Sequence, residues 1–247
     1  MDVNIDWLTV KWDRTNDNAI MFDNLWRPSL TRKGQMFMYT VFGGEWFSMS
    51  DSANQDGKDI VRQALATKGK VTRVDFAIDL QLTVDYDALY VYMQSVLGKE
   101  YYVYRYTSQT GYTVYVGKRS SKRFLRIYNK RAEVNEKKGI DVGFDWCRIE
   151  LEVKKEAIAT YLLTFLNQSS DKIAQDIVTR YMLKGFFGDC LNDGDLLRVP
   201  RIRQKRDALL FCERYKRIIR EAFLQNRRLF FKMLLRKGID DDKMCKS

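Results

Sequence analysis

Three stretches of the sequence alternate charged and apolar residues with the period of a β-strand. In "TRVDFAIDL" (72–80) and "CRIELEV" (147–153), one face is apolar and the other carries Arg73, Asp75, Asp79, Arg148, Glu150 and Glu152. In "RFLRIYNK" (123–130), Arg126, Tyr128 and Lys130 share a face. If the three strands belong to one sheet, that face collects carboxylates, cations and a phenol.

These residue types suit phosphoryl chemistry. Carboxylate oxygens without histidine favour a hard divalent cation such as Mg²⁺ or Mn²⁺, which can polarise a phosphoryl group. Arg126 and Lys130 could hold a phosphate, and Tyr128 is the candidate nucleophile. Its ordinary pKa of about 10 means that nearby positive charge or a metal must favour the phenolate. The alternative is a solvated antiparallel sheet with cross-strand ion pairs that contribute about 0.2–1 kcal/mol each.

Composition narrows the classes of function. The chain has 247 residues and no histidine, which excludes histidine triads, histidine bases and histidine-ligated metals. Its net charge is +11, and the segment from Arg198 to Lys237 holds 14 basic and three acidic residues, so the excess lies there. A neutral body with a basic extension favours a polyanion as partner, nucleic acid first and an anionic membrane second.

The pattern of elements predicts an α+β body at 1–188 and a basic helical extension at 199–240. Strands are expected at 4–12, 70–80, 122–130 and 146–154. Hairpins are expected at 101–116 and at 36–49, the latter turning at Gly43 and Gly44, where a bulge is the alternative. Helices are expected at 57–69, 85–98, 156–167, 171–187 and 201–237. We therefore expect the body to be a mostly antiparallel β-sheet with flanking helices.

The basic residues supply candidate DNA contacts. Two come from the sheet, and the others follow one face of the expected C-terminal helix, opposite an apolar face. The candidates are Arg73, Arg148, Arg203, Lys205, Arg206, Arg214, Lys216, Arg217, Arg220, Arg227 and Arg228. Tyrosines at 101, 102, 104 and 106 could belong to the core or stack on unpaired bases.

The motifs "VTRVDFAIDL", "YVGKRSSKRFLRIYNKRAE" and "WCRIELEVKKEAI", in this order, resemble the replication initiation factor family, the rolling-circle initiators of plasmids and their phage and conjugative relatives. The resemblance covers about 70–160. It implies a distant relative of the HUH nicking-enzyme fold without its paired histidines. It also implies that Tyr128 attacks the DNA backbone and becomes linked to the 5′ phosphate. Asp75, Glu150, Asp79 and Glu152 then match the metal-binding acidic residues.

The resemblance leads to an expected function and expected partners. We expect a metal-dependent enzyme that nicks and rejoins origin DNA, single-stranded or in a hairpin, and starts rolling-circle replication. A host helicase and a second copy of the chain are expected partners, and a cytoplasmic location without membrane association is expected. A conjugative relaxase and a non-catalytic DNA-binding regulator remain alternatives. Tyr181 is the competing nucleophile, although its apolar helical context favours packing.

Overall fold

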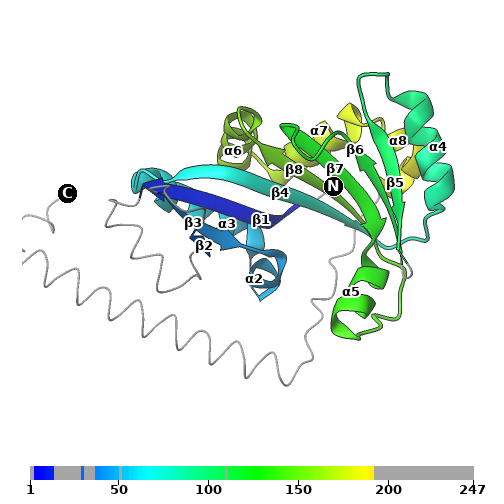
Figure 1. The fold of residues 1–247 in the computed structure, drawn as a ribbon, viewed down its shortest axis with the longest axis horizontal. Coiled ribbons are helices and arrows are strands. Elements are labelled where there is room, and N and C mark those ends of the chain that lie inside the picture. The colour runs from blue at the N-terminus through cyan, green and yellow to red at the C-terminus, as the bar shows by residue number, and fades with distance from the viewer. Residues whose placement is uncertain (1–2, 14–28, 31–36, 50–51, 109–110, 192–247) are drawn as a thin grey trace, which may run out of the picture.

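The structure is a computed structural model that describes residues 3–13, 29–30, 37–49, 52–108 and 111–191. Its described strands form one eight-stranded sheet in the order β2-β3-β1-β4-β8-β7-β6-β5, with antiparallel neighbours throughout (Figure 1). The strands are β1 (Asn4–Asp13), β2 (Ser29–Leu30), β3 (Phe37–Phe42), β4 (Lys70–Leu80), β5 (Val103–Thr107), β6 (Tyr112–Val116), β7 (Arg123–Asn129) and β8 (Cys147–Lys154). The expected α+β class and the hairpin β5–β6 are confirmed.

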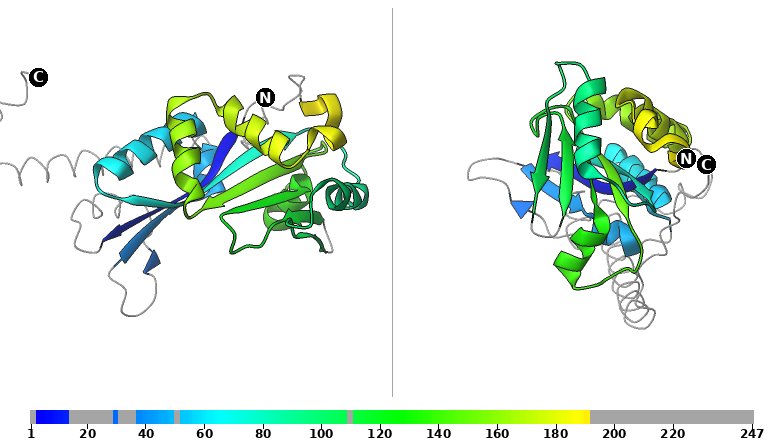
Figure 2. Two further views of the ribbon diagram at one scale, coloured as in Figure 1. Left: turned by 90° about the horizontal axis from the view of Figure 1, so that it is seen from above. Right: turned by 90° about the vertical axis from the view of Figure 1, so that its right-hand side faces the viewer.

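Helices flank the sheet (Figure 2). They are α2 (Gly44–Met49), α3 (Ala53–Ala66), α4 (Tyr86–Val96), α5 (Lys130–Lys138), α6 (Ala157–Asn167), α7 (Ser170–Arg180) and α8 (Lys184–Phe187), followed by the 3-10 turn η1 (Gly188–Leu191). None of the helices in the described ranges is long and apolar enough to cross a membrane. The proposed boundary at 188–199 and the basic extension lie at or beyond the end of the described residues, so they stay predictions.

The core lies between the apolar face of the sheet and α3, α4, α6 and α7. The ring of Phe76 on β4 contacts Phe165 and Tyr161 of α6, with centroids 5.5 and 6.1 Å apart. Helix α3 approaches β1 so closely that a Cβ on Gly57 would come 2.9 Å from Ile5 Cγ2. Because helices cover this face of the sheet, the charged residues of β4 and β8 must point to the opposite face.

The expected hairpin at 36–49 is wrong. The chain leaves β3 at Phe42 and starts α2, where Phe47 N–H donates to Gly43 O at 3.2 Å. Trp46 packs edge-on against Phe42 and Phe47, with centroids 5.2 and 4.9 Å apart, so burial of these rings favours a helix over a second strand. The Gly pair allows a close approach to β1, since a Cβ on Gly43 would lie 3.2 Å from the Trp7 ring.

Three element boundaries also differ from expectation. Helix α3 begins at Ala53 rather than 57, because the Ser52 side chain accepts from Gln55 N–H and caps it. The helix expected at 171–187 is broken after Arg180, where Met182 adopts a positive φ of 53° before α8. The strand expected at 122–130 ends at Asn129, whose side chain accepts from the N–H of Ala132 and caps α5.

Candidate active site

The strand register places most of the predicted site residues on the face of the sheet opposite the apolar core, where their side chains are largely buried. On β4 and β8, Asp75 lies opposite Glu152 and Asp79 lies opposite Arg148. On β7, Arg126 lies opposite Glu150 and Tyr128 lies opposite Arg148. The three motifs, separated in sequence, thus occupy three adjacent strands.

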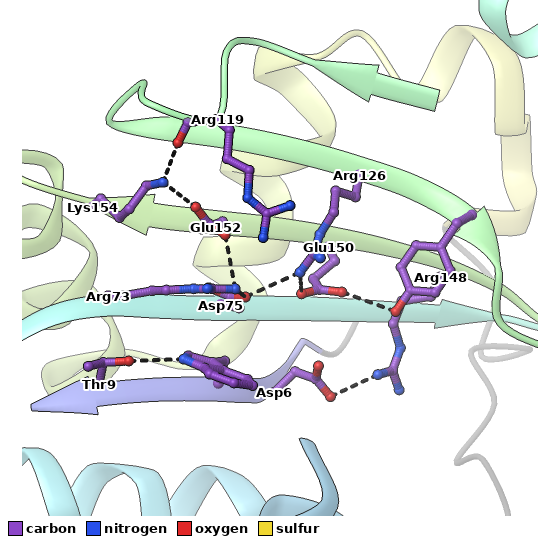
Figure 3. A network of polar contacts seen from close by, with 12 residues as sticks. Asp6, Thr9, Arg73, Asp75, Arg119, Arg126, Arg148, Glu150, Glu152 and Lys154 are labelled. Carbon is purple, nitrogen blue, oxygen red and sulfur yellow. Dashed lines mark hydrogen bonds and ion pairs between the residues drawn. The ribbon is translucent and has the colours of Figure 1, made fainter. Parts of the chain in front are cut away.

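Two arginines hold the acidic residues at the centre of this face (Figure 3). Arg73 donates to Asp75 from Nε at 2.8 Å and from Nη2 at 2.5 Å, and its Nη2 lies 2.9 Å from Glu152 Oε2. Arg126 Nη2 donates to Glu150 Oε1 and lies 3.4 Å from Asp75 Oδ2. We call Asp75, Glu150 and Glu152, all buried, the carboxylate cluster. Charge-assisted bonds from two strands fix the positions of these side chains.

The carboxylate cluster brings negative charges close together. Burial raises the pKa of Asp75 to about 7; the hydrogen bond from Arg73 opposes this rise, and the negative charge of Glu150 adds to it. Two adjacent carboxyl groups cannot both ionise freely without a compensating positive charge. The cluster therefore favours a bound proton or a cation at neutral pH.

Tyr128 lies beside the cluster. Its hydroxyl donates to Glu150 Oε2 at 3.1 Å, while Glu150 Oε1 faces Arg126. Burial raises the pKa of Tyr128 well above its ordinary value, the charge of Glu150 raises it further, and the Arg148 guanidinium opposes the rise. The phenol is therefore protonated at neutral pH, and Glu150 is positioned to accept its proton.

Lys130 is near Tyr128 but does not share its strand. It is the first residue of α5, its Nζ lies 5.7 Å from the centre of the Tyr128 ring, and it pairs with Glu133 at 2.5 Å. Burial lowers the pKa of Lys130, as does the positive charge of Arg148. The expected alternation of Arg126, Tyr128 and Lys130 on one strand is thus wrong for its last member, because Asn129 caps a helix there.

Arg148 forms a second group of ion pairs. It donates to Asp79 from Nε at 2.7 Å and from Nη2 at 2.9 Å, and to Asp6 from Nη1 at 2.8 Å. Trp146 Nε1 also donates to Asp79, at 2.7 Å. These bonds hold the guanidinium next to Tyr128. Sequence reasoning missed Asp6, whose signal is weak because a register shift between Ile5 and Trp7 interrupts the alternation of β1.

The four predicted metal ligands fall into two places. Asp79 is held by Arg148 and Trp146, away from the carboxylate cluster, and within the described ranges no three acidic or sulfur side chains converge as a metal site. Asp75 and Glu150 fit a hard divalent cation by donor type and by their mutual repulsion. Arg73 and Arg126, which contact their oxygens, would have to turn aside to make room for it.

Among the other candidates, Tyr181 packs in the core. It is 2% exposed, and its ring meets that of Tyr101 edge-on with centroids 6.0 Å apart. The predicted DNA contacts of the C-terminal segment lie outside the described residues: Arg203, Lys205, Arg206, Arg214, Lys216, Arg217, Arg220, Arg227 and Arg228. Arg73 and Arg148, the two DNA-contact candidates on the sheet, are engaged by acidic partners.

Comparison with known proteins agrees with the resemblance of the sequence. Residues 69–184 match the family model described as replication initiation factor. The fold is similar to a rolling circle replication initiator protein from Geobacillus stearothermophilus, with a TM-score of 0.54 and 16% sequence identity over 73% of this chain and 85% of that chain. No curated protein sequence matches the chain significantly. The three strands of the candidate site lie within the matched region.

Proposed function

Because residues 69–184 match the replication initiation factor family, we propose that this protein initiates rolling-circle replication by nicking and rejoining one DNA strand at an origin. The observation that carries the proposal is the position of Tyr128. Its hydroxyl donates to a buried carboxylate, Glu150, on a sheet face where Arg126 and Arg148 flank it. A nucleophile, a proton acceptor and fixed cations therefore lie within one network.

The proposed reaction is a transesterification. Tyr128 Oη attacks the phosphorus of the scissile phosphodiester and its proton passes to Glu150. The bond from phosphorus to the 3′ oxygen breaks, and the leaving oxygen takes a proton from water to become a 3′ hydroxyl. The 5′ phosphate stays on Tyr128 as a phosphodiester, so the reverse reaction can rejoin the strand without ATP.

Arg126 and Arg148 are suited to stabilise the charge that grows on the phosphoryl oxygens. The Arg148 guanidinium is fixed by Asp79 and needs little reorganisation during the reaction, whereas Arg126, which Glu150 holds, would move when a cation binds that carboxylate. Arg126 Nε is buried and makes no hydrogen bond within the described part of the chain, so one donor of this guanidinium is left unsatisfied in the structure. A Mg²⁺ or Mn²⁺ ion held by Asp75 and Glu150 would supply further charge stabilisation.

The test is covalent capture. The protein, incubated with a 5′-labelled or 3′-labelled origin oligonucleotide, should retain the 3′ label only, because the adduct forms on the 5′ phosphate of the downstream fragment. Peptide mapping should place the adduct on Tyr128. Tyr128→Phe should bind the oligonucleotide and form no adduct, since it loses one oxygen and little packing.

Tyr181→Phe is the matched control and should cleave like the wild type. An adduct on another tyrosine, or cleavage by Tyr128→Phe at a comparable rate, would show that the nucleophile is misassigned. Origin binding without any adduct would favour a non-catalytic regulator.

A further inference from the structure

A column of aromatic rings crosses the charged face of the sheet beside the candidate active site. It runs through Phe124 on β7, Tyr115 on β6, Tyr104 on β5 and Tyr102 just before β5. Neighbouring centroids lie 5.5, 4.8 and 5.2 Å apart, and the first three rings are nearly parallel, within 17°. We call these four residues the aromatic column.

The register puts the aromatic column on the same face as the site. Tyr115 lies directly opposite Arg126, and Tyr104 lies directly opposite Tyr115. Phe124 lies opposite Glu152 of the carboxylate cluster. The column therefore leads from the carboxylate cluster to β5, the strand at the edge of the sheet (Figure 1).

Exposure rises along the column. Phe124 is 1% exposed, Tyr115 and Tyr104 are half-buried, and Tyr102 is 57% exposed. Core packing accounts for the inner ring but not for the outer ones, because a large exposed ring gains little from burial. An accessible ring, Tyr102, is therefore left at the outer end of the column.

A second exposed ring lies in line with Tyr128. Tyr106 on β5 is 60% exposed and pairs with Thr113 on β6, which in turn pairs with Tyr128. The two tyrosine backbones are thus two strand spacings apart, roughly 10 Å. The residue between them in the register is the small Thr113.

Basic residues lie in the turn beside Phe124 and Tyr115, where Lys122 pairs with Glu156 at 3.2 Å. The turn between β6 and β7 contains Lys118, Arg119 and Lys122 and no acidic residue. Arg119 lies close enough to Tyr104 to lower its pKa, although burial raises that pKa more. Exposed rings beside cations match a strand of unpaired nucleotides, whose bases stack and whose phosphates need positive charge.

We propose that Tyr102 and Tyr106, the exposed rings at this edge, form a stacking platform for unpaired bases of the single-stranded DNA next to the scissile phosphate, and that Tyr104 supports Tyr102 from below. The proposal rests on the proposed function for the identity of the ligand. Paired bases are already stacked within a duplex and cannot use the platform. The surface therefore selects single-stranded or melted DNA and directs its backbone toward Tyr128.

The test measures binding without cleavage. The full chain carrying Tyr102→Leu or Tyr106→Leu is titrated into a fluorescent 12-nucleotide single strand and into its duplex, with EDTA present. Each leucine variant should bind the single strand on the order of 5- to 100-fold more weakly, as expected for the loss of one stacked base, and the duplex equally well. Tyr106→Phe keeps the ring and should bind like the wild type.

Tyr112→Leu is the matched control. Tyr112 belongs to the same hairpin and is 45% exposed, but it faces α4, where its ring stacks on Tyr86 with centroids 6.2 Å apart. This variant should leave single-strand binding unchanged. The loss in Tyr106→Leu should be the same at every salt concentration, because stacking releases no counterions.

A single strand lacking its bases separates stacking from every other role. The wild type and the leucine variants should bind this strand equally weakly, because without bases neither ring has a stacking partner. The stacking proposal would be wrong if the leucine variants lost equal affinity for the single strand and for the duplex. It would also be wrong if they changed the oligomeric state and not the DNA affinity. Failure of the Tyr128 adduct with intact ring-dependent binding would overturn the nicking mechanism alone.

Discussion

The Tyr128 hydroxyl donates a hydrogen bond to Glu150 Oε2 at 3.1 Å, across the boundary between β7 and β8. This contact joins a phenol whose pKa is raised by burial to a carboxylate that can take its proton. It links two sequence motifs more than 20 residues apart into a unit that can generate a nucleophile.

Replacing Glu150 by Gln should remove this proton acceptor while it keeps the shape of the side chain. Cleavage should fall by about 10²–10⁴-fold, the usual contribution of a general base, and DNA affinity should be retained. The measurement is single-turnover cleavage of an origin oligonucleotide, with Glu156→Gln as the control because Glu156 is exposed. Restoration of the rate by more Mg²⁺ would instead assign Glu150 to metal binding alone.

Cleavage should require Mg²⁺ or Mn²⁺ and stop with EDTA, because the candidate ligands Asp75 and Glu150 are both oxygen donors. Mn²⁺ binding, followed by the electron paramagnetic resonance signal of the free ion, should weaken in Asp75→Asn. The control Asp141→Asn alters an exposed carboxylate and should bind Mn²⁺ like the wild type. Full cleavage activity in EDTA would exclude a metal at the carboxylate cluster.

The raised pKa of Asp75 predicts how stability depends on pH. The pKa of Asp75 is about 7 in the folded protein, and in the unfolded chain we take its ordinary value of 3.8. Between these pH values the folded state therefore binds more protons than the unfolded state. The contribution of Asp75 to stability therefore decreases as pH rises through this window, by at most roughly 1.4 kcal/mol per pH unit. Urea unfolding in EDTA at pH 5 and pH 7 measures it.

In Asp75→Asn this contribution should vanish, because the amide has no proton to lose. On going from pH 5 to pH 7, the variant should therefore lose less unfolding free energy than the wild type does. The same difference in both proteins would mean that Asp75 titrates normally in the fold.

The ion pair of Arg148 with Asp79 should be important for stability. Asp79→Asn leaves a buried guanidinium without its main counter-charge, and we expect a loss of about 3–5 kcal/mol in the free energy of unfolding. The control is Asp141→Asn, which breaks an exposed pair with Arg131 and should change stability little. Urea unfolding measures both, and equal losses would contradict a special role for the buried pair.

The sequence by itself determined which side chains share a face. Strand geometry turns successive residues to opposite sides, so the alternation in 72–80 and 147–153 placed Asp75 and Glu150 on the same face once both strands belong to one sheet with their apolar sides on the core. The same reasoning gave the α+β class and the Tyr-rich hairpin. The absence of histidine restricted the chemistry to carboxylates, cations and a phenol without any structure.

Only the tertiary structure decided which of these residues meet. The order β4-β8-β7 pairs Asp79 with Arg148 and Tyr128 with Glu150, and strand order depends on the packing of the whole sheet, which no local period encodes. The irregular β1 brought Asp6 to Arg148, and the cap at Asn129 moved Lys130 onto a helix. A side chain's direction is a local property of the backbone, whereas its partners depend on contacts between distant segments.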